Sequence, residues 1–451
     1  MSNSVLWTPA LFGFAGLFLP RRWAGWWAVL GTVVTLGLAI ALLAGFDSGA
    51  SGLQDTVDVT WISGLGVDYS LGVDGLNVFL IVLTAVLWVA GTAFAAFREQ
   101  ERPHLFFLMM LLGESATLGA FLAQDLLLFV LFFDLMLVPF YFLFGAWGRD
   151  RGDGPSASAA TLKMIVYTLI GSLLMLVGAI ATAIIAADGG QITFSIAELS
   201  QHTLSEGSQR WIFCFFAVAF LVKMPAFLLH GWMPDAYRAA PLPALVVFSG
   251  VLAKVGAYGF LRVVLPLFPD ATVEFQEVIL VIALASILYG SVMAFTQTNM
   301  RLVAGYSSVA QLGFVTAGIF ALSADGSDGA VLQMVNHGLV VAPLFLIVAI
   351  LAERSGSEDM TRMGGMAIGA PVLAALFLIV TLATLAMPGS ANFIGEFYIL
   401  NGTFQTKIVY AFVAAIGVVL AAYYAIRLFQ RTMHNRLPDG IASREISLRD
   451  A

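Results

Sequence analysis

Long apolar stretches recur along this chain and constrain its fold more than any other feature. Each is about 17 to 25 residues long, the length an α-helix needs to cross a hydrocarbon layer about 30 Å thick. We count about thirteen of them, at residues 5–20, 24–45, 74–97, 104–123, 125–147, 161–187, 211–230, 243–268, 275–296, 301–323, 330–352, 370–404 and 408–430. The twelfth is overlong because the sequence MPGSAN, at 387–392, interrupts it. The pattern predicts an all-α integral membrane protein.

The composition agrees with this class. Hydrophobic residues make up 60% of the 451 and charged residues only 11%, and the mean hydropathy is +0.93, far from the balance of a soluble domain. A net charge of -7 argues against nucleic acid as a partner. Cys214 is the only cysteine, and neither cysteine arrays nor a glycine-rich phosphate loop is present. We therefore expect no cofactor and no metal on this chain.

Basic residues fall in alternate loops and predict the orientation. They are Arg21, Arg22, Arg98, Arg102, Arg149, Arg151, Arg238, Arg301, Arg354, Arg362, Arg427, Arg431 and Arg436. Apart from Arg210 and Lys407, the intervening loops are acidic or neutral, and 46–73 carries four aspartates without a basic residue. The positive-inside rule therefore places the N-terminus outside.

Two proline-interrupted spans suggest an internal repeat. Spans four to eight and nine to thirteen each contain five helices, and the fourth is broken, at Pro225 and at Pro388. Five is odd, so the two repeats would have opposite topology, as in many ion-coupled transporters. We predict three N-terminal helices over 1–103, a first inverted repeat over 104–268, a second over 269–431 and a cytoplasmic tail over 432–451.

Lys223 is the most informative charged residue. It lies in the run WIFCFFAVAFLVKMPAFLLH, two residues before Pro225 and seven before His230. A charged side chain near the bilayer centre costs about 3 kcal/mol or more, so such residues usually serve a function. Proline breaks the helix beside it, and freed carbonyls in lipid are tolerated only where protein or water satisfies them. The buried lysine, the helix break at Pro225 and the histidine that follows it together indicate a path for ions through the membrane.

Other ionisable residues are spread over neighbouring spans. They are Asp134, Lys163, Lys254, His337 and Glu396. A zinc or iron site needs three or four convergent ligands, so this sparse series of mixed type suits a proton relay better than a metal site. Burial favours the neutral forms of lysine and carboxylate, whereas an opposite charge within about 4 to 6 Å restores the charged form. Each repeat is thus predicted to hold one proton half-channel.

In this hypothesis, movement of Asp134 switches the protonation of Lys223. The lysine holds its proton while the carboxylate is near and passes it toward Lys254, and finally Glu396, when the carboxylate withdraws. A static ion pair between Asp134 and Lys223 is the structural alternative.

The remaining candidates also have structural readings. His230 and His337 can donate hydrogen bonds to broken-helix carbonyls without titrating, and Lys163 can extend to the membrane interface. The sequence leaves open whether Glu114 is a relay member or a neutral packing residue.

With these residues in place, the chain resembles the M-type antiporter-like membrane subunits of bacterial NADH-quinone oxidoreductase, respiratory complex I. The resemblance runs from about Tyr69 to the end of the chain and is highly specific. Its carriers are YSLGVDGLNVFLIVLT at 69–84, FFDLMLVPFYFLFGAWG at 132–148, KMIVYTLIGSLLMLVGAI at 163–180, VKMPAFLLHGWMPDAY at 222–237, SGVLAKVGAYGFLR at 249–262, AGYSSVAQLGFVTAGIF at 304–320, QMVNHGLVVAPLF at 333–345 and MPGSANFIGEF at 387–397.

The resemblance implies a function. The positions matched by Lys223, Lys254 and Glu396 form the core of the family's proton path, and the carboxylate matched by Asp134 pairs with the first lysine. Related L, N and antiporter D subunits typically have lysine where this chain has Glu396, which favours the M type. The resemblance further implies a proton-translocating, non-redox subunit in the bacterial cytoplasmic membrane, in contact with lipid and with L-, N- and K-like subunits. NADH, FMN, iron-sulfur clusters and quinone are then expected on other subunits.

The chain departs from the family pattern at several positions. Asp134 stands where glutamate is usual, Gln311 stands where histidine is common, and Tyr237 with Arg238 replaces a His-Thr-like pair. Relatives also have a fourteenth helix after a segment like SREISLRDA, where this chain stops, so we expect a truncated or incomplete chain.

Two other readings remain. A subunit of a multisubunit cation/proton antiporter, or of a hydrogenase-type respiratory complex, would use the same path. A passive scaffold is disfavoured because each intramembrane charge costs roughly 3 kcal/mol with nothing gained.

Overall fold

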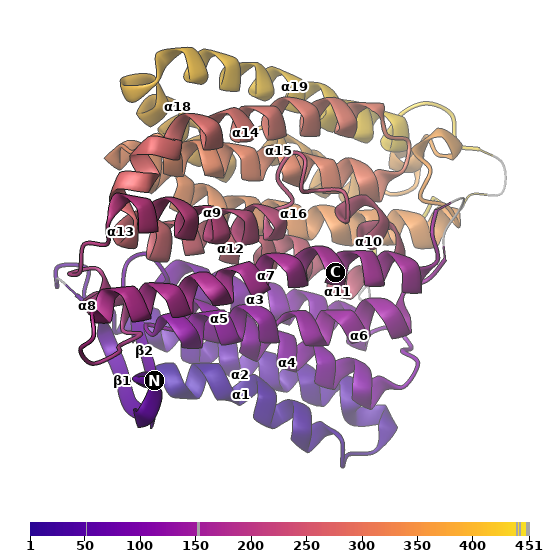
Figure 1. Ribbon diagram of the computed structural model, residues 1–451. Helices are drawn as coiled ribbons and strands as arrows, with labels where there is room; N and C mark the ends of the chain where they lie inside the picture. The colour runs from indigo at the N-terminus through magenta and orange to yellow at the C-terminus, as the bar shows by residue number, and fades with distance from the viewer. Residues whose placement is uncertain (51, 151–153, 439–440, 442, 448–451) are drawn as a thin grey trace. The chain divides into compact units, whose positions relative to one another are not determined.

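The structure is a computed structural model, and it describes the whole chain except residues 51, 151–153, 439–440, 442 and 448–451. Helices dominate it (Figure 1). Contacts divide the chain into two compact units. The first comprises Met1–Asp150, Pro155–Met224 and Val251–Phe275, and the second consists chiefly of Pro225–Gly250 and Gln276–Ala451. We describe each unit by itself.

The first unit contains the N-terminal helices and a hairpin. Its elements are α1 (Ser2–Gly16), α2 (Ala24–Ala44), β1 (Gln54–Ile62), β2 (Val67–Val73), α3 (Val78–Ala96), α4 (Pro103–Leu122), α5 (Leu126–Leu135), α6 (Leu137–Trp147), α7 (Ala157–Ala187), α8 (Ile196–Leu199), α9 (Glu206–Lys223), α12 (Ala253–Gly259) and α13 (Leu265–Leu267). Two π-helical segments, Phe248–Leu252 and Phe260–Val264, flank α12.

The second unit is built around one fully buried helix. Its elements are α10 (Met233–Ala239), α11 (Leu242–Val247), most of α14 (Pro269–Thr296), α15 (Met300–Phe320), α16 (Ala324–Ser355), α17 (Pro371–Thr384), α18 (Ala391–Thr406) and α19 (Ile408–Met433). Every residue of α15 is buried. Because α10, α16, α18 and α19 all contact α15, side chains from these helices meet around it.

The prediction of a helical membrane protein is confirmed. Within the described residues, 10 helices are long and apolar enough to cross a membrane. The remaining predicted spans are α1, α9 and the broken pair α17 and α18, which are shorter or carry more polar residues. The two compact units do not follow the predicted repeat boundaries, since 225–250 groups with the second unit. The repeat division itself therefore stays a prediction.

The β-hairpin is an element that the all-α prediction lacked. Strands β1 and β2 pair antiparallel, with Val59 opposite Tyr69 and Gln54 opposite Val73. Gly66 lies beside the turn with a φ of 66°, and a Cβ there would collide with the carbonyl oxygen of Ile192. The sequence analysis treats this segment as a loop because it lies between two apolar spans. Its alternating valine, threonine and tryptophan residues are the strand signal that this interpretation passed over.

Candidate functional site

The first broken helix ends at the predicted lysine. Helix α9 stops at Lys223, Pro225 supplies no N–H, and regular helix resumes only at Met233. Within the break, Leu228 has a φ of 72°, a left-handed value that is unfavourable for a leucine. Such strained backbone clusters at functional sites. The break predicted from the sequence is therefore present, and it places Lys223 at a helix end.

Lys223 and Asp134 lie together in the first unit. Only 4% of Lys223 is exposed. Its Nζ donates to the carbonyl oxygen of Phe133 at 3.5 Å and lies 4.6 Å from the centre of the Phe133 ring. Asp134, the next residue, is the carboxylate whose charge acts on Lys223. Its Oδ1 is buried and has no hydrogen-bond partner among the described residues. A carbonyl and an aromatic face thus hold the ammonium, rather than a direct carboxylate bond.

The helix that carries Asp134 is interrupted at Met136, two residues after it. Helix α5 ends at Leu135 and α6 begins at Leu137. Pro139 has no N–H to donate to the carbonyl of Leu135, four residues earlier, which explains the interruption.

Lys254 lies on α12 between the two π-helical segments and is fully buried. Pro266 explains the second segment, because it cannot donate to the carbonyl of Arg262. A Cβ on Gly256 would lie 2.9 Å from the carbonyl oxygen of Phe220. Glycine there lets α12 pack closely against the end of α9, near Lys223. Short π-helical segments are frequent at functional sites.

Lys163 does not lie among the buried groups. It is exposed near the beginning of α7. This placement agrees with a side chain that extends toward the membrane interface.

An ion-pair network follows Lys254 along the same span, and the sequence analysis missed it. Arg262 Nη2 donates to Asp74 Oδ2 at 2.6 Å, and its Nε donates to the Tyr258 hydroxyl at 2.9 Å. Tyr258 in turn donates to the carbonyl oxygen of Phe121 at 2.9 Å. These bonds tie the Lys254 span to the start of α3 and the end of α4. The position of Arg262 inside an apolar span was the feature of the sequence that could have revealed this network.

Glu396 lies after the second break, on the helix that follows it, whereas Lys223 lies before the first. Residues 385–390 are not helical, and Ala386 and Gly389 have positive φ values of 54° and 97°. Glu396 lies on α18 and is 2% exposed. Gln311 Nε2 donates to its Oε1 at 2.8 Å, while Gln333 Nε2 donates to Gln311 Oε1 at 2.6 Å. The structure thus joins α15, α16 and α18 through one chain of amide hydrogen bonds.

The two predicted histidines lie in different surroundings of the second unit. His337 is 3% exposed and lies on α16, one helical turn after Gln333. His230 lies in the first break, where its ring packs 4.8 Å from Tyr289 and 6.4 Å from Tyr306. Aromatic rings thus fix the position of His230.

A second buried ion pair also escaped the sequence analysis. Arg301, assigned there to a loop, is fully buried at the start of α15. Its Nη2 donates to Glu358 Oε1 at 2.6 Å, and its Nη1 donates to the carbonyl oxygens of Tyr237 and Ala240. Arg301 therefore holds the C-terminal end of α10, the helix that follows the first break.

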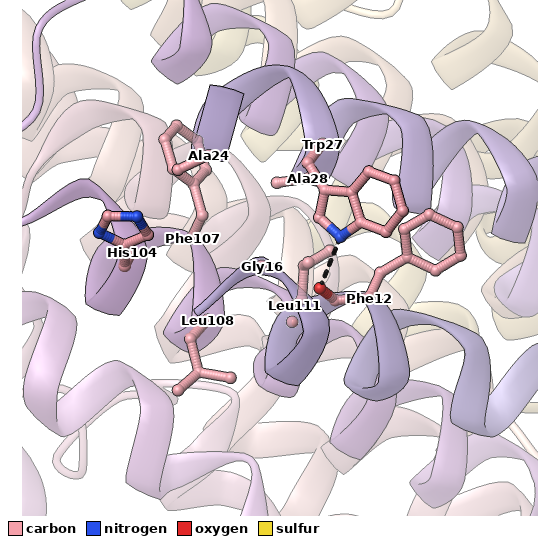
Figure 2. Close-up of a pocket in the computed structure, with 10 residues that line it drawn as sticks. Phe12, Gly16, Ala24, Trp27, Ala28, His104, Phe107, Leu108 and Leu111 are labelled. Atoms are coloured by element: carbon pink, nitrogen blue, oxygen red, sulfur yellow. Dashed lines mark hydrogen bonds between the residues drawn. The ribbon is translucent and has the colours of Figure 1, made fainter. Parts of the chain in front are cut away.

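A cavity among the N-terminal helices carries no comparable chemistry. Figure 2 shows its lining from α1, α2 and α4, in which the Trp27 Nε1 donates to the Phe12 carbonyl oxygen at 3.0 Å. His104 is the titratable side chain of this lining, and its Nε2 bonds the carbonyl oxygen of Leu19 at 2.8 Å. The rest is apolar or aromatic, so this cavity is a packing defect rather than part of the relay.

With this geometry described, the chain can be compared with known proteins. The family described as NADH:quinone oxidoreductase/Mrp antiporter, TM matches residues 123–422, which include every predicted relay residue. The chain belongs to this antiporter family. The M-type resemblance drawn from the motifs is confirmed by relatives of that name.

Two relatives and one solved structure define the match to the antiporter family. NADH-quinone oxidoreductase subunit M of Rhodobacter capsulatus is 37% identical over 424 residues, covering 92% of this chain and 81% of the relative. The Escherichia coli K12 protein of the same name is 38% identical over 441 residues, covering 96% and 85%. A chain of respiratory complex I from Thermus thermophilus with bound NADH superposes with a TM-score of 0.91 at 30% identity, covering 100% of this chain and 92% of that one.

Proposed function

We propose that this chain is the M-type antiporter-like subunit of a respiratory complex I and moves protons across the bacterial cytoplasmic membrane, with its N-terminus outside. One observation carries the proposal. Each of two broken helices presents one buried ionisable group, Lys223 at the end of α9 and Glu396 on α18. Membership of the antiporter family and the names of the relatives support the same assignment.

The first unit loads and releases a proton at Lys223. The ammonium is stabilised by the carboxylate of Asp134 and by the carbonyl and ring of Phe133. When Asp134 withdraws, the buried ammonium loses its main electrostatic support, and the proton passes toward Lys254. The close approach of α12 to α9 at Gly256 shortens that path.

The second unit receives the proton at Glu396. Its Oε1 accepts from Gln311, while its Oε2 has no hydrogen-bond partner among the described residues. A proton bound at Oε2 therefore does not disturb the amide chain. His337 and His230, which both lie in the second compact unit, are assigned to the relay as groups that can exchange protons near neutral pH.

The chain itself performs no redox step in this proposal. NADH, FMN, iron-sulfur clusters and quinone belong to other subunits, and L-, N- and K-like membrane subunits are the expected neighbours. Energy from quinone reduction reaches this chain as a shift between two arrangements of its charged groups.

The test is NADH-driven proton pumping by the intact complex in sealed vesicles, with wild type compared to Glu396→Gln and Lys223→Ala. Assembly is checked by the content of the other subunits. We expect both variants to lose pumping while the complex remains assembled. Unchanged pumping and electron transfer in both would show that these residues are structural.

A further inference from the structure

The ion pair of Arg262 and Asp74 lies in the first unit, on the outer side of Lys254. Lys254 and Tyr258 are fully buried. The side chains of Arg262 and Asp74 are 13% and 23% exposed. Asp74 directly follows strand β2, and the acidic segment 46–73 before it is on the side that the proposed function places outside. The ion pair therefore lies between the buried lysine and the outer surface.

Lys254, Tyr258 and Arg262 lie on one face of their span, because they follow one another at intervals of four residues. The Nε of Arg262 donates to the Tyr258 hydroxyl at 2.9 Å, so this face continues through the second π-helical segment. Eight helical residues span no more than about 12 Å along the axis. At that distance two charges inside a membrane interact, since little water screens them.

The guanidinium of Arg262 lies between a phenol and a carboxylate. Its Nε bonds the Tyr258 hydroxyl, and its Nη2 donates to Oδ2 of Asp74 at 2.6 Å. The other carboxylate oxygen, Oδ1, accepts from two backbone N–H groups just before α3, at 3.0 and 3.3 Å. The carboxylate is thus fixed from both sides. The ion pair turns its positive end toward Lys254 and its negative end toward the outer surface.

Arg262 cannot carry a proton as the buried lysines can, because a guanidinium in a protein does not release its proton. The Tyr258 hydroxyl donates to the carbonyl oxygen of Phe121 at 2.9 Å and accepts from Arg262, so its own proton is already engaged. A proton arriving from the outer surface therefore meets a permanent positive charge. In selective membrane pores an arginine of this kind acts as a barrier to protons and cations.

We propose that Arg262 is an electrostatic barrier that closes the Lys254 site to protons from the outer side of the membrane. Asp74 and Tyr258 are positioning residues that hold the guanidinium. The inference rests on the proposed function, in which Lys254 takes its proton from Lys223. With the outer side closed, that proton passes on toward the second unit, and the proton gradient does not run back through Lys254.

The experiment measures passive proton leak through the intact complex in sealed vesicles without NADH. An acid pulse is applied to the outer face of the complex, valinomycin and potassium balance the charge, and a trapped dye reports the pH. Arg262→Met removes the charge but keeps the length of the side chain, while Arg262→Gln also keeps hydrogen-bonding groups. Arg210→Met is the matched control, because Arg210 pairs with Glu274 at the same distance, 2.6 Å, but is 51% exposed.

We expect both Arg262 variants to raise the leak by at least about tenfold, the lower end of the effect that local fields have on ion encounter. Arg210→Met is expected to leave the leak unchanged. Asp74→Asn keeps the positive charge, so its leak is expected to rise far less than that of Arg262→Met. Adding Lys254→Met to Arg262→Met is expected to abolish the extra leak, because the protons enter at Lys254. Subunit content checks assembly.

A wild-type leak in both Arg262 variants would overturn the barrier. An equal leak in Asp74→Asn and Arg262→Met would also overturn it, because the ion pair would then seal the span only by holding helices together. The same holds for an extra leak that persists without Lys254. If Lys223→Ala and Glu396→Gln pump normally, the proposed function fails, and the Lys254-dependent leak still decides whether Arg262 is a barrier.

Discussion

The two buried sites of this chain are held in different ways. In the first unit, Lys223 has a 3.5 Å contact to a carbonyl and an aromatic face, and one oxygen of its carboxylate partner is unpaired within the described residues. In the second, Glu396 is fixed by amide hydrogen bonds of 2.8 and 2.6 Å. Short bonds to neutral amides fix the position of a carboxylate, whereas a carboxylate without a direct bond to its lysine is free of that restraint. We therefore expect Asp134 in the first unit to move and Glu396 in the second to keep its position.

The largest expected effect comes from removing the mobile charge. Lys223→Ala is expected to reduce proton pumping by about 100-fold or to background, because a positioned proton carrier typically contributes that much. Lys223→Met, which keeps the length and apolar contacts of the side chain, is expected to match it. Pumping in vesicles is the measurement, with subunit content as the control. Recovery of pumping in the methionine variant alone would mean that Lys223 acts through packing.

The next effect tests whether the second site depends on its fixed geometry. Gln311→Ala leaves Glu396 Oε1 and the Gln333 amide without their partner, and a buried unsatisfied polar group costs about 1 to 3 kcal/mol. We expect a lower thermal unfolding midpoint and slower pumping. Gln311→His introduces the imidazole that the family resemblance implies at this position and is expected to pump at least as well as wild type. Poor pumping by the histidine variant in a stable complex would show that the amide is specifically needed.

The side-chain length at the mobile site gives a smaller effect. Asp134→Glu adds one methylene toward Lys223, strengthens the pair and slows its opening, so turnover is expected to fall by a few-fold, roughly 1 kcal/mol of added attraction. Asp134→Asn removes the charge, and the turnover of this variant is expected to be lower still. NADH turnover and the number of protons pumped per NADH are measured on the same samples. Equal turnover in both variants would contradict a switching carboxylate.

Glu114 offers a sharper comparison, because it is fully buried on α4 and neither carboxyl oxygen has a hydrogen-bond partner among the described residues. An ionised carboxylate in such a place would be very costly, so we expect the neutral form in this arrangement. Glu114→Gln keeps shape and neutrality, and we expect wild-type assembly and pumping. Lost pumping would add Glu114 to the relay of the first unit.

The smallest effect concerns the cap on the second broken helix. Glu445, in the tail, accepts from the backbone N–H groups of Val372 and Leu373 at the start of α17. Partial burial raises the pKa of Glu445, but these N–H groups, that of Ile446 and the charge of Arg354 outweigh it, so the pKa lies below its ordinary value.

A lowered pKa fixes the sign of the pH dependence at Glu445. Its contribution to stability is present above the ordinary glutamate pKa of about 4.3 and disappears as pH falls through the lower folded-state pKa. Glu445→Gln is therefore expected to lower the thermal midpoint slightly at pH 7 and not at strongly acidic pH. A midpoint difference that grows on acidification would contradict this assignment.

The sequence was sufficient for the spans, the two breaks and the burial of Lys223, Lys254 and Glu396, since each depends on local hydropathy or on proline. It was not sufficient for Lys163, which is exposed. It was not sufficient for Arg262 and Arg301, because their burial depends on partners distant in sequence, Asp74 and Glu358. The amide chain from Gln333 to Glu396 joins three helices, and glutamine has no pattern of its own in an apolar span. The hairpin lies between two spans, and its strand alternation is carried by a short segment that hydropathy alone marks as a loop.

The helix interruption at Met136 offers a way to move the carboxylate of Asp134 that does not depend on the length of its side chain. Helix α5 is only ten residues long, and Asp125 caps its start through a 2.9 Å bond from the backbone N–H of Leu128. Its far end lacks one main-chain bond because of Pro139. If the chain bends at this joint, α5 is expected to move as a body, and its carboxylate would then be displaced by the backbone rather than by rotamer change. A neighbouring element that bent α5 against α6 would in that case change the charge state of Lys223 without touching either residue.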